Sequence, residues 1–205
     1  MKTDVILAGF GGQGMLLIGK LLSEAAMTEG KEVCWLPSYG PEMRGGTANV
    51  TVTISNEPIG SPVVSTPTAA AVMNQPSLEK FGPAIVPGGQ LIINESLVKV
   101  RFERDDIDVM YLPANELANE IKAKRSPNIV VLGAYVALSN VVDPDAVREQ
   151  VQGHFAHKPK IAELNLQAFQ LGFDAARTHL TERGKRPTGG ATEGKPTAGN
   201  GGKES

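Results

Sequence analysis

The residues best suited to chemistry in this chain are closely spaced glycines near its N-terminus. Gly9, Gly11 and Gly14 fit the pattern G-x-G-x-x-G, and a short apolar strand beginning at Asp4 runs directly into them. In such a pattern the first glycine allows a tight turn, the second lets the backbone approach a phosphate, and the third lets the helix pack against the strand. The spacing therefore predicts a phosphate-binding loop.

The expected contacts to the anion are backbone N–H groups at the start of the helix that follows. A helix start leaves its first N–H groups without internal partners, and these groups attract anions. The candidate donors are Gly11, Gly12, Gln13 and Gly14, and the side-chain amide of Gln13 is a further donor. A glycine turn that only packs the helix on the strand, with no ligand, remains the alternative.

The chain lacks the acid that a nicotinamide site normally carries. Such sites place Asp or Glu about 20 residues beyond the glycines, at the end of the second strand, to bind the ribose. Here the second predicted strand, 32–36, has no acid at its end, and Glu42 lies in the loop beyond it. The pattern suits a phosphate-bearing ligand that need not be a nicotinamide.

A second group of candidates follows the second strand, in a loop rich in glycine and proline. Arg44, next to Gly45, can make a bidentate contact to phosphate or carboxylate, or form a structural pair with Glu42 or an intersubunit ion pair. Ser38 and Tyr39 can offer hydroxyls to a ligand or stabilise the turn.

Asn74 is the last candidate, because it follows a strand predicted to end at Met73. Ligands of open α/β sheets bind outside the carboxyl ends of the strands. Asn74 can instead cap a helix that has Pro76 at its first position.

The elements that must position these residues alternate along the chain. Apolar periodicity predicts strands at 4–8, 32–36, 48–54, 69–73, 90–94 and 108–112, and helices from about 15 to 30 and near 77–81, 114–124, 129–140, 144–152 and 159–177. The strand at 48–54 alternates apolar and polar residues, which is typical of one wet face and suits an edge or an antiparallel insertion. We predict a three-layer α/β fold, Rossmann-like, with a mostly parallel sheet and helices on both faces.

Composition limits the classes of function. The 205 residues, 41% of them hydrophobic, can form one core, and a net charge of −2 without a long basic run argues against nucleic acid. No apolar run approaches the roughly 20 residues that span a bilayer, and no secretory signal is evident. We therefore expect a cytoplasmic protein made of a domain at 1–183 and a disordered tail at 184–205, where Gly, Pro, Thr, Lys and Glu dominate.

Cysteine and histidine content narrows the chemistry further. The single Cys34 excludes an internal disulfide and any Cys-ligated iron–sulfur cluster built by this chain alone, and we expect it to be a small buried side chain. His154, His157 and His179 lack a repeated metal-ligand spacing, so we expect surface or capping roles and no metal site.

Two motifs together carry a family resemblance. The segments 9–15 and 38–47, followed by the strand and loop at 71–76, resemble the gamma subunit of 2-oxoacid:ferredoxin oxidoreductases, enzymes of anaerobic metabolism. The resemblance covers 3–170. The second motif is more similar to the branches acting on 2-oxoglutarate and ketoisovalerate than to the indolepyruvate branch.

The resemblance implies a subunit of a larger enzyme, inactive when isolated. The complex would decarboxylate a 2-oxoacid, transfer the acyl group to coenzyme A and reduce ferredoxin. Thiamine diphosphate, magnesium and 4Fe-4S clusters are expected on alpha, beta and ferredoxin-like delta subunits, whereas this chain is expected to contribute to coenzyme A binding and subunit packing. The alternatives are a stand-alone NAD(P)-binding oxidoreductase and a purely structural assembly subunit.

Overall fold

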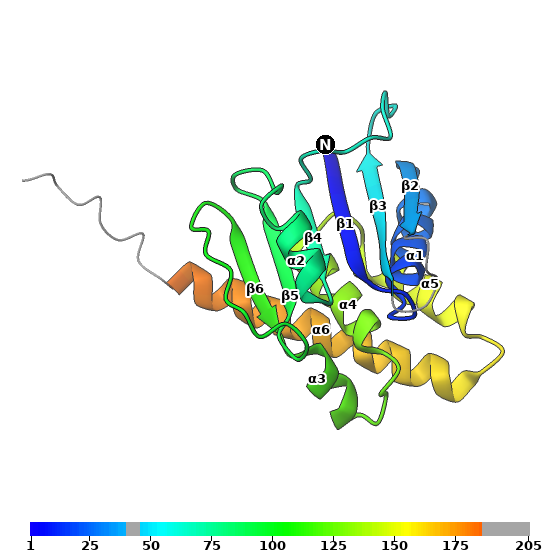
Figure 1. The fold of residues 1–205 in the computed structure, drawn as a ribbon. Helices are drawn as coiled ribbons and strands as arrows, with labels where there is room; N and C mark the ends of the chain where they lie inside the picture. The colour runs from blue at the N-terminus through cyan, green and yellow to red at the C-terminus, as the bar shows by residue number, and fades with distance from the viewer. Residues whose placement is uncertain (40–45, 186–205) are drawn as a thin grey trace, which may run out of the picture.

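The computed structural model describes residues 1–39 and 46–185, and its chain trace is shown in Figure 1. The predictions for Glu42, Arg44 and Gly45 lie outside the described residues, as does the tail predicted at 184–205 except for its first two residues. Those two residues continue the last helix, so the ordered domain extends to Lys185, two residues beyond the expected boundary.

Six strands form one mixed sheet in the order β2-β3-β1-β4-β5-β6. The strands are β1 (Lys2–Phe10), β2 (Glu32–Tyr39), β3 (Thr47–Ser55), β4 (Ala69–Val72), β5 (Gln90–Asn94) and β6 (Asp108–Leu112). The helices are α1 (Met15–Thr28), α2 (Gln75–Phe81), α3 (Ala114–Glu120), α4 (Pro127–Ser139), α5 (Pro144–His154) and α6 (Pro159–Lys185). All the predicted strands and helices are present, with ends that differ by a few residues except at α6, which extends to Lys185 instead of ending at 177.

The strand β3 is the antiparallel insertion that its alternating sequence allowed. It lies between β1 and β2 and is antiparallel to both, whereas β1, β4, β5 and β6 pair in parallel. The expected wet face is wrong near the end of the strand. Thr53 is buried there because its hydroxyl donates a hydrogen bond of 2.6 Å to the buried carboxylate of Asp4 on β1.

The strand β2 lies at one edge of the sheet, as its proline indicates, and β6 lies at the other. Pro37 has no N–H to donate to a sheet, and proline within strands is confined to edges. Cys34 on this strand is half-buried, so the prediction of a buried cysteine is wrong. The reason is the edge position, since only one neighbouring strand, β3, covers β2.

The two faces of the sheet have separate cores, because successive residues of a strand point to opposite sides. Val5 and Leu7 join a large cluster with α1, α4, α5 and α6, whereas Ile6 and Ala8 join a smaller cluster with α2 and the loop after β5. Figure 1 shows α2 on the near side of the sheet and α4 and α6 on the far side. The three-layer prediction is confirmed, with most of the helical mass on one face.

The helices α4 and α6 cross at a backbone-to-backbone contact. A Cβ atom on Gly133 would lie 2.0 Å from the carbonyl oxygen of Phe169, and one on Gly172 would lie 1.8 Å from that of Val130. Only glycine permits this separation. The crossing holds α4 and α6 in close contact, and Ser126, before α4, bonds to Asn165 in the second turn of α6.

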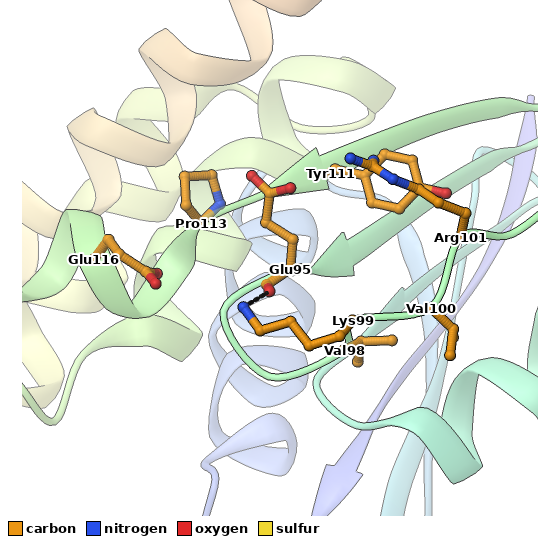
Figure 2. Close-up of a pocket in the computed structure, with 8 residues that line it drawn as sticks. All are labelled: Glu95, Val98, Lys99, Val100, Arg101, Tyr111, Pro113 and Glu116. Carbon is orange, nitrogen blue, oxygen red and sulfur yellow. Dashed lines mark hydrogen bonds between the residues drawn. The ribbon is translucent and has the colours of Figure 1, made fainter.

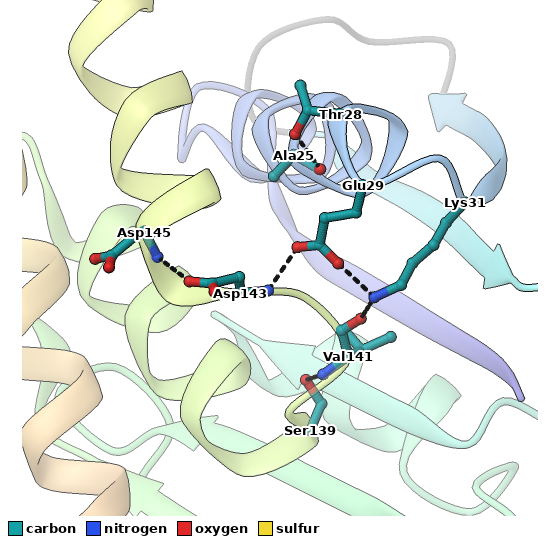
Figure 3. A network of polar contacts seen from close by, with 8 residues as sticks. All are labelled: Ala25, Thr28, Glu29, Lys31, Ser139, Val141, Asp143 and Asp145. Carbon is teal, nitrogen blue, oxygen red and sulfur yellow. Dashed lines mark hydrogen bonds and ion pairs between the residues drawn. The ribbon is translucent and has the colours of Figure 1, made fainter.

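A polar network joins the end of α1 to the loop between α4 and α5 (Figure 3). Glu29 accepts a hydrogen bond of 2.6 Å from the backbone N–H of Asp143 and pairs with Lys31 at 2.6 Å. Lys31 also donates to the carbonyl of Val141. The network holds α1 and α5 in a fixed relation at the amino ends of the parallel strands.

No helix in the described part of the chain is long and apolar enough to cross a membrane.

Candidate functional site

The glycine loop connects β1 to α1 at the carboxyl end of the parallel strands. Gly14 is the N-cap of α1 in the left-handed conformation, with φ 75°, and Gly12 has φ 95°. Residues with side chains rarely adopt such angles, so glycine is required at both positions. The helix therefore starts without a side-chain cap, and the first turn contains no acid.

The free N–H groups are fewer than the sequence predicted. Gly11 donates to the carbonyl of Gly46 at 2.9 Å and Gln13 donates to that of Phe10 at 3.1 Å, so the backbone N–H groups of these two predicted donors already have partners. The Gln13 N–H is satisfied within the turn and the Gly11 N–H by the residue before β3, and the sequence pattern reveals neither contact. The backbone N–H groups of Gly12 and Gly14 have no backbone partner in the described residues and stay candidate donors.

Gly9 makes room for the side chain of Gln13. A Cβ on Gly9 would lie 2.5 Å from Gln13 Oε1, and that oxygen accepts a hydrogen bond of 2.6 Å from the N–H of Phe10. The Gln13 carboxamide therefore stabilises the loop through its oxygen, which leaves its NH₂ group for a ligand.

Gly14 serves a different contact from the expected one. A Cβ there would lie 2.4 Å from the side-chain nitrogen of Asn128 on α4, which donates to the Gly14 carbonyl at 3.2 Å. The contact between helix and strand instead depends on Gly19, whose Cβ would lie 2.6 Å from Val50 on β3. The third glycine thus positions α4 against the loop.

Two cavities meet at this loop, and both are lined by Gly12, Gln13 and Arg125. The first, which we call the helix-end cavity, has a volume of about 440 Å³, and its other described lining residues are Gly14, Leu17, Ser126, Asn128, Ile129, His154, Phe155, His157, Lys158, Ile161 and Asn165. The second, the strand-end cavity, has about 510 Å³, and its other described lining residues are Met73, Leu97, Asn115, Lys124 and Pro127.

The charges around these cavities are of one sign. Arg125 and Lys158 line the helix-end cavity and Lys124 lines the strand-end cavity, whereas no Asp or Glu is among the described lining residues of either. None of the three cations forms an ion pair with a described carboxylate. Unneutralised cations around a concave surface favour an anionic ligand.

A third cavity provides a contrast, because its charges are balanced. Figure 2 shows Glu95, Lys99, Arg101, Tyr111 and Glu116 around a hollow of about 270 Å³ beyond β5 and β6. The Arg101 guanidinium lies 4.3 Å from the centre of the Tyr111 ring. A hydrogen bond from Ser96 lowers the pKa of Glu116, so this carboxylate is negative at neutral pH and opposes anion binding there.

Three helix starts and the carboxyl end of α5, at His154, border the helix-end cavity. α4 begins at Pro127 and α6 at Pro159, so both helices, like α1, direct their amino ends toward it. Ser126 donates to the Asn165 oxygen at 2.6 Å, which joins the starts of α4 and α6 by a buried contact. Helix starts carry partial positive charge, which adds to that of Arg125 and Lys158.

Three other predicted site residues lie outside these cavities. Ser38 and Tyr39 are exposed at the end of β2, where Tyr39 pairs with Ala48 and Ala48 pairs with Gly9. They therefore share the carboxyl end of the sheet with the loop but lie two strands from it. Asn74 caps α2 by accepting a hydrogen bond of 2.8 Å from the Ser77 N–H, which is the helix-cap alternative of the sequence analysis. The NH₂ group of Asn74 has no partner among the described residues.

Sequence reasoning missed the cationic residues of the cavities. The adjacent Lys124 and Arg125, directly before a Ser-Pro helix start, were a usable signal. His154 and His157 are exposed as predicted and also line the helix-end cavity. His179 is partly buried and bonds to Asp108 at 2.9 Å, so it is a structural contact between α6 and β6.

The sheet order argues against a dinucleotide site. In a Rossmann fold the second strand lies next to the first and delivers the ribose acid beside the glycine loop. Here β3 lies between β1 and β2, so an acid at the end of β2 would be about 10 Å away, two strand spacings.

The fold and the site define an open α/β domain with a cationic cavity at its glycine loop. The chain matches the pyruvate ferredoxin/flavodoxin oxidoreductase family over residues 4–175, and it belongs to that family.

Two relatives show how the chain corresponds to longer and shorter proteins. It is 39% identical over 180 residues to "Ketoisovalerate oxidoreductase subunit VorA" of Methanothermobacter thermautotrophicus, a match covering 87% of this chain but 37% of that protein. It is 35% identical over 181 residues to "2-oxoglutarate synthase subunit KorC" of Methanocaldococcus jannaschii, covering 86% of this chain and 95% of KorC. The chain thus spans about a third of the first relative and nearly all of the second.

Two solved structures share the fold. The keto/oxoacid ferredoxin oxidoreductase gamma subunit from Geobacter sulfurreducens is 31% identical, with a TM-score of 0.74 over 86% of this chain and 99% of that one. The 2-oxoglutarate:ferredoxin oxidoreductase from Magnetococcus marinus, with 2-oxoglutarate, coenzyme A and succinyl-CoA bound, is 25% identical, with a TM-score of 0.80 over 86% of this chain and 31% of that one.

Proposed function

We propose that this chain is the gamma component of a multisubunit 2-oxoacid:ferredoxin oxidoreductase in the cytoplasm. The observation that carries the proposal is the match to KorC, which extends over nearly the whole of that subunit. The substrate is a 2-oxoacid such as 2-oxoglutarate or 2-oxoisovalerate, the acids named for the relatives. The complex converts it to acyl-CoA and CO₂ and reduces ferredoxin.

The partner chains would supply the electron-transfer and decarboxylation chemistry. The alpha, beta and delta subunits would hold thiamine diphosphate, which activates the 2-oxoacid, together with magnesium and 4Fe-4S clusters. Among the described residues, no group of three His, Cys, Asp or Glu side chains is placed to hold a metal ion. The contribution of this chain is then to bind and orient the co-substrate.

Coenzyme A fits the cationic cavities by charge. Its diphosphate would lie at the glycine loop, where the N–H groups of Gly12 and Gly14 and the NH₂ group of Gln13 have no partner in the described part of the chain. The exposed Arg125, which lines both cavities, would neutralise the phosphate charge. By holding the diphosphate, the loop would direct the thiol arm toward the partner that carries the acyl group.

The test replaces Gly12 in the assembled complex. A Gly12→Leu side chain would enter space that both cavities share, because nothing lies within 4 Å of its Cβ position. We expect the KM for coenzyme A to rise at least about tenfold while the complex still assembles, since a blocked loop loses charge-assisted hydrogen bonds. Gly30→Leu is the matched control, because Gly30 also has a positive φ, of 74°, and open surroundings.

The outcomes separate the alternatives. Co-purification with thiamine-binding and iron–sulfur subunits, together with coenzyme A-dependent 2-oxoacid oxidation, supports the gamma component. An unchanged KM in Gly12→Leu would favour a purely structural subunit, and a lone chain that binds NAD or NADP would favour an independent oxidoreductase.

A further inference from the structure

We propose that the hollow beyond β5 and β6, which we call the charged hollow, is a contact surface for a second copy of this chain. In this contact Arg101 of each copy pairs with Glu116 of the other. The proposal goes beyond the proposed function and does not depend on it. It is carried by two opposite charges that line one hollow, are each held in position by a neighbour, and form no ion pair with a described residue.

The guanidinium of Arg101 is held in place without a counter-charge. It lies 4.3 Å from the centre of the Tyr111 ring, and the Tyr111 hydroxyl accepts a hydrogen bond of 2.8 Å from the backbone N–H of Phe102. No described carboxylate forms an ion pair with Arg101. The stacking uses the flat face of the guanidinium, so the N–H groups around its edge remain for a carboxylate of another molecule.

The carboxylate of Glu116, in the first turn of α3, is the matching anion. It accepts a hydrogen bond from the hydroxyl of Ser96, which itself accepts one of 3.0 Å from the backbone N–H of Asn115. Glu116 also forms no ion pair within the described part of the chain. Because neighbouring groups already restrict both charged side chains, pairing them with another molecule costs less conformational entropy than pairing two free side chains.

The arrangement of the two charges suits a twofold contact. Arg101 and Glu116 lie on opposite sides of the charged hollow, with Glu95 and Lys99 between them (Figure 2). In a twofold contact the same patch is used by both copies, so each residue meets its counterpart's partner. A twofold axis that lies in the contact plane and crosses the hollow would bring each Arg101 to the Glu116 of the other copy, and two equal ion pairs would form.

The charge balance favours a second copy over an unlike partner. The described lining residues include two acids and two bases, so the charged hollow has no net charge with which to repel its own copy, and its charges are complementary to themselves. Glu95 and Lys99 in the middle are of opposite sign and add no net charge near the axis. Val100, which also lines the hollow, is 39% exposed and would lose apolar surface to water in the contact.

The experiment measures the mass of the full chain in solution by analytical ultracentrifugation. We expect the wild type to form a dimer that dissociates as salt is raised, because partly exposed ion pairs are screened. Arg101→Glu and Glu116→Arg should each raise the dissociation constant of the dimer at least about tenfold, since like charges then face each other at both pairs.

An equimolar mixture of the Arg101→Glu and Glu116→Arg variants should restore the dimer. In the mixed dimer one copy presents two acids and the other two bases, so both pairs are again of opposite sign. A variant that failed to fold would not be rescued in this way. The matched control is Glu120→Arg, because Glu120 is an exposed acid on the same helix that does not line the hollow, and this variant should dimerise like the wild type.

Three results would overturn the proposal: a wild type that stays monomeric at every concentration, single variants that dimerise as the wild type does, or a mixture that stays monomeric. Hydrogen exchange at 95–101 that slows only when the partner chains of the complex are added would assign the hollow to an unlike partner, which also contradicts a second copy. All of these results leave the proposed function intact, because coenzyme A-dependent oxidation by the complex tests it separately.

Discussion

At the glycine loop, the glycines act mainly because they have no Cβ atom. Gly9 has no Cβ where Gln13 Oε1 folds back, and Gly14 has none where Asn128 approaches from α4. Gly12 differs from both, because its surroundings are open and only its φ of 95° demands glycine. The first and third glycines therefore build the loop, and Gly12 is left facing the space that a ligand would fill.

Tyr135 allows the effect of burial on the pKa and stability contribution of one side chain to be tested. It is 1% exposed, and its hydroxyl has no hydrogen-bond partner among the described residues, so burial raises the pKa of the phenol above its ordinary value. A raised pKa in the folded state contributes stability that is present below the unfolded pKa of about 10 and is lost as pH rises beyond it.

We therefore predict that Tyr135→Phe is neutral or raises the free energy of unfolding by about 1 kcal/mol near neutral pH, because it removes an unsatisfied polar group. Above about pH 10 the wild type should lose stability faster than the variant. Urea unfolding of both proteins across this pH range measures the effect, with the exposed Tyr39→Phe as control. A Tyr135→Phe variant destabilised by several kcal/mol would show that the hydroxyl has an essential partner.

Among the elements, the pair α4 and α6 determines where the cavity lies. Their contact at Gly133 and Gly172 brings the two backbones together, and the bond between Ser126 and Asn165 joins their starts. Arg125 precedes Ser126, the N-cap of α4, and Lys158 directly precedes α6. The positions of Arg125 and Lys158 therefore depend on a helix crossing that itself contains no predicted ligand-binding residue.

We predict that Gly172→Ala lowers the free energy of unfolding by about 3 kcal/mol or more, because a Cβ would lie 1.8 Å from the Val130 oxygen and the helices must separate. Chemical denaturation measures the loss. Gly153→Ala in α5 is the control, since its Cβ position is open, and it should be neutral or slightly stabilising. Equal effects of the two substitutions would contradict the close crossing.

Over the whole molecule, charge and topology together favour an anionic ligand at the glycine loop. The net charge is −2, so no general attraction for anions exists, and the positive potential is local to the two cavities. Among the parallel strands, the chain leaves β1 toward β2 on one side and returns to β4 on the other, so the glycine loop lies where the strand order reverses. Ligands of open α/β sheets bind at such a point.

We predict that coenzyme A, and not NAD, raises the melting temperature of the complex. A ligand at about 100 times its Kd stabilises the state it binds by about 2.7 kcal/mol. The stabilisation should weaken as salt is raised, because the contacts are ionic and partly exposed. Thermal unfolding with each ligand at low and high salt gives the measurement, and stabilisation by NAD alone would revive the dinucleotide alternative.

The sequence by itself determined the elements, the glycine loop and the family. Those features are local: apolar periodicity defines strands and helices, and two short motifs at fixed order carry the resemblance. It also included the cap at Asn74 and an antiparallel insertion at β3 among its alternatives, because capping chemistry and alternation depend on a few neighbouring residues.

Only the tertiary structure decided which loop donors are free, that β3 separates β1 from β2, and that Arg125 and Lys158 line a cavity with Gly12. The last of these unites residues more than 100 positions apart. The contact of Asn128 with Gly14 brings the start of α4 to the loop, and the helix crossing at Gly133 and Gly172 packs α6 against α4. Each of the two crossing glycines alone resembles an ordinary weak point in a helix. Side chains from distant segments form a site through packing, and packing depends on shapes that a linear pattern does not contain.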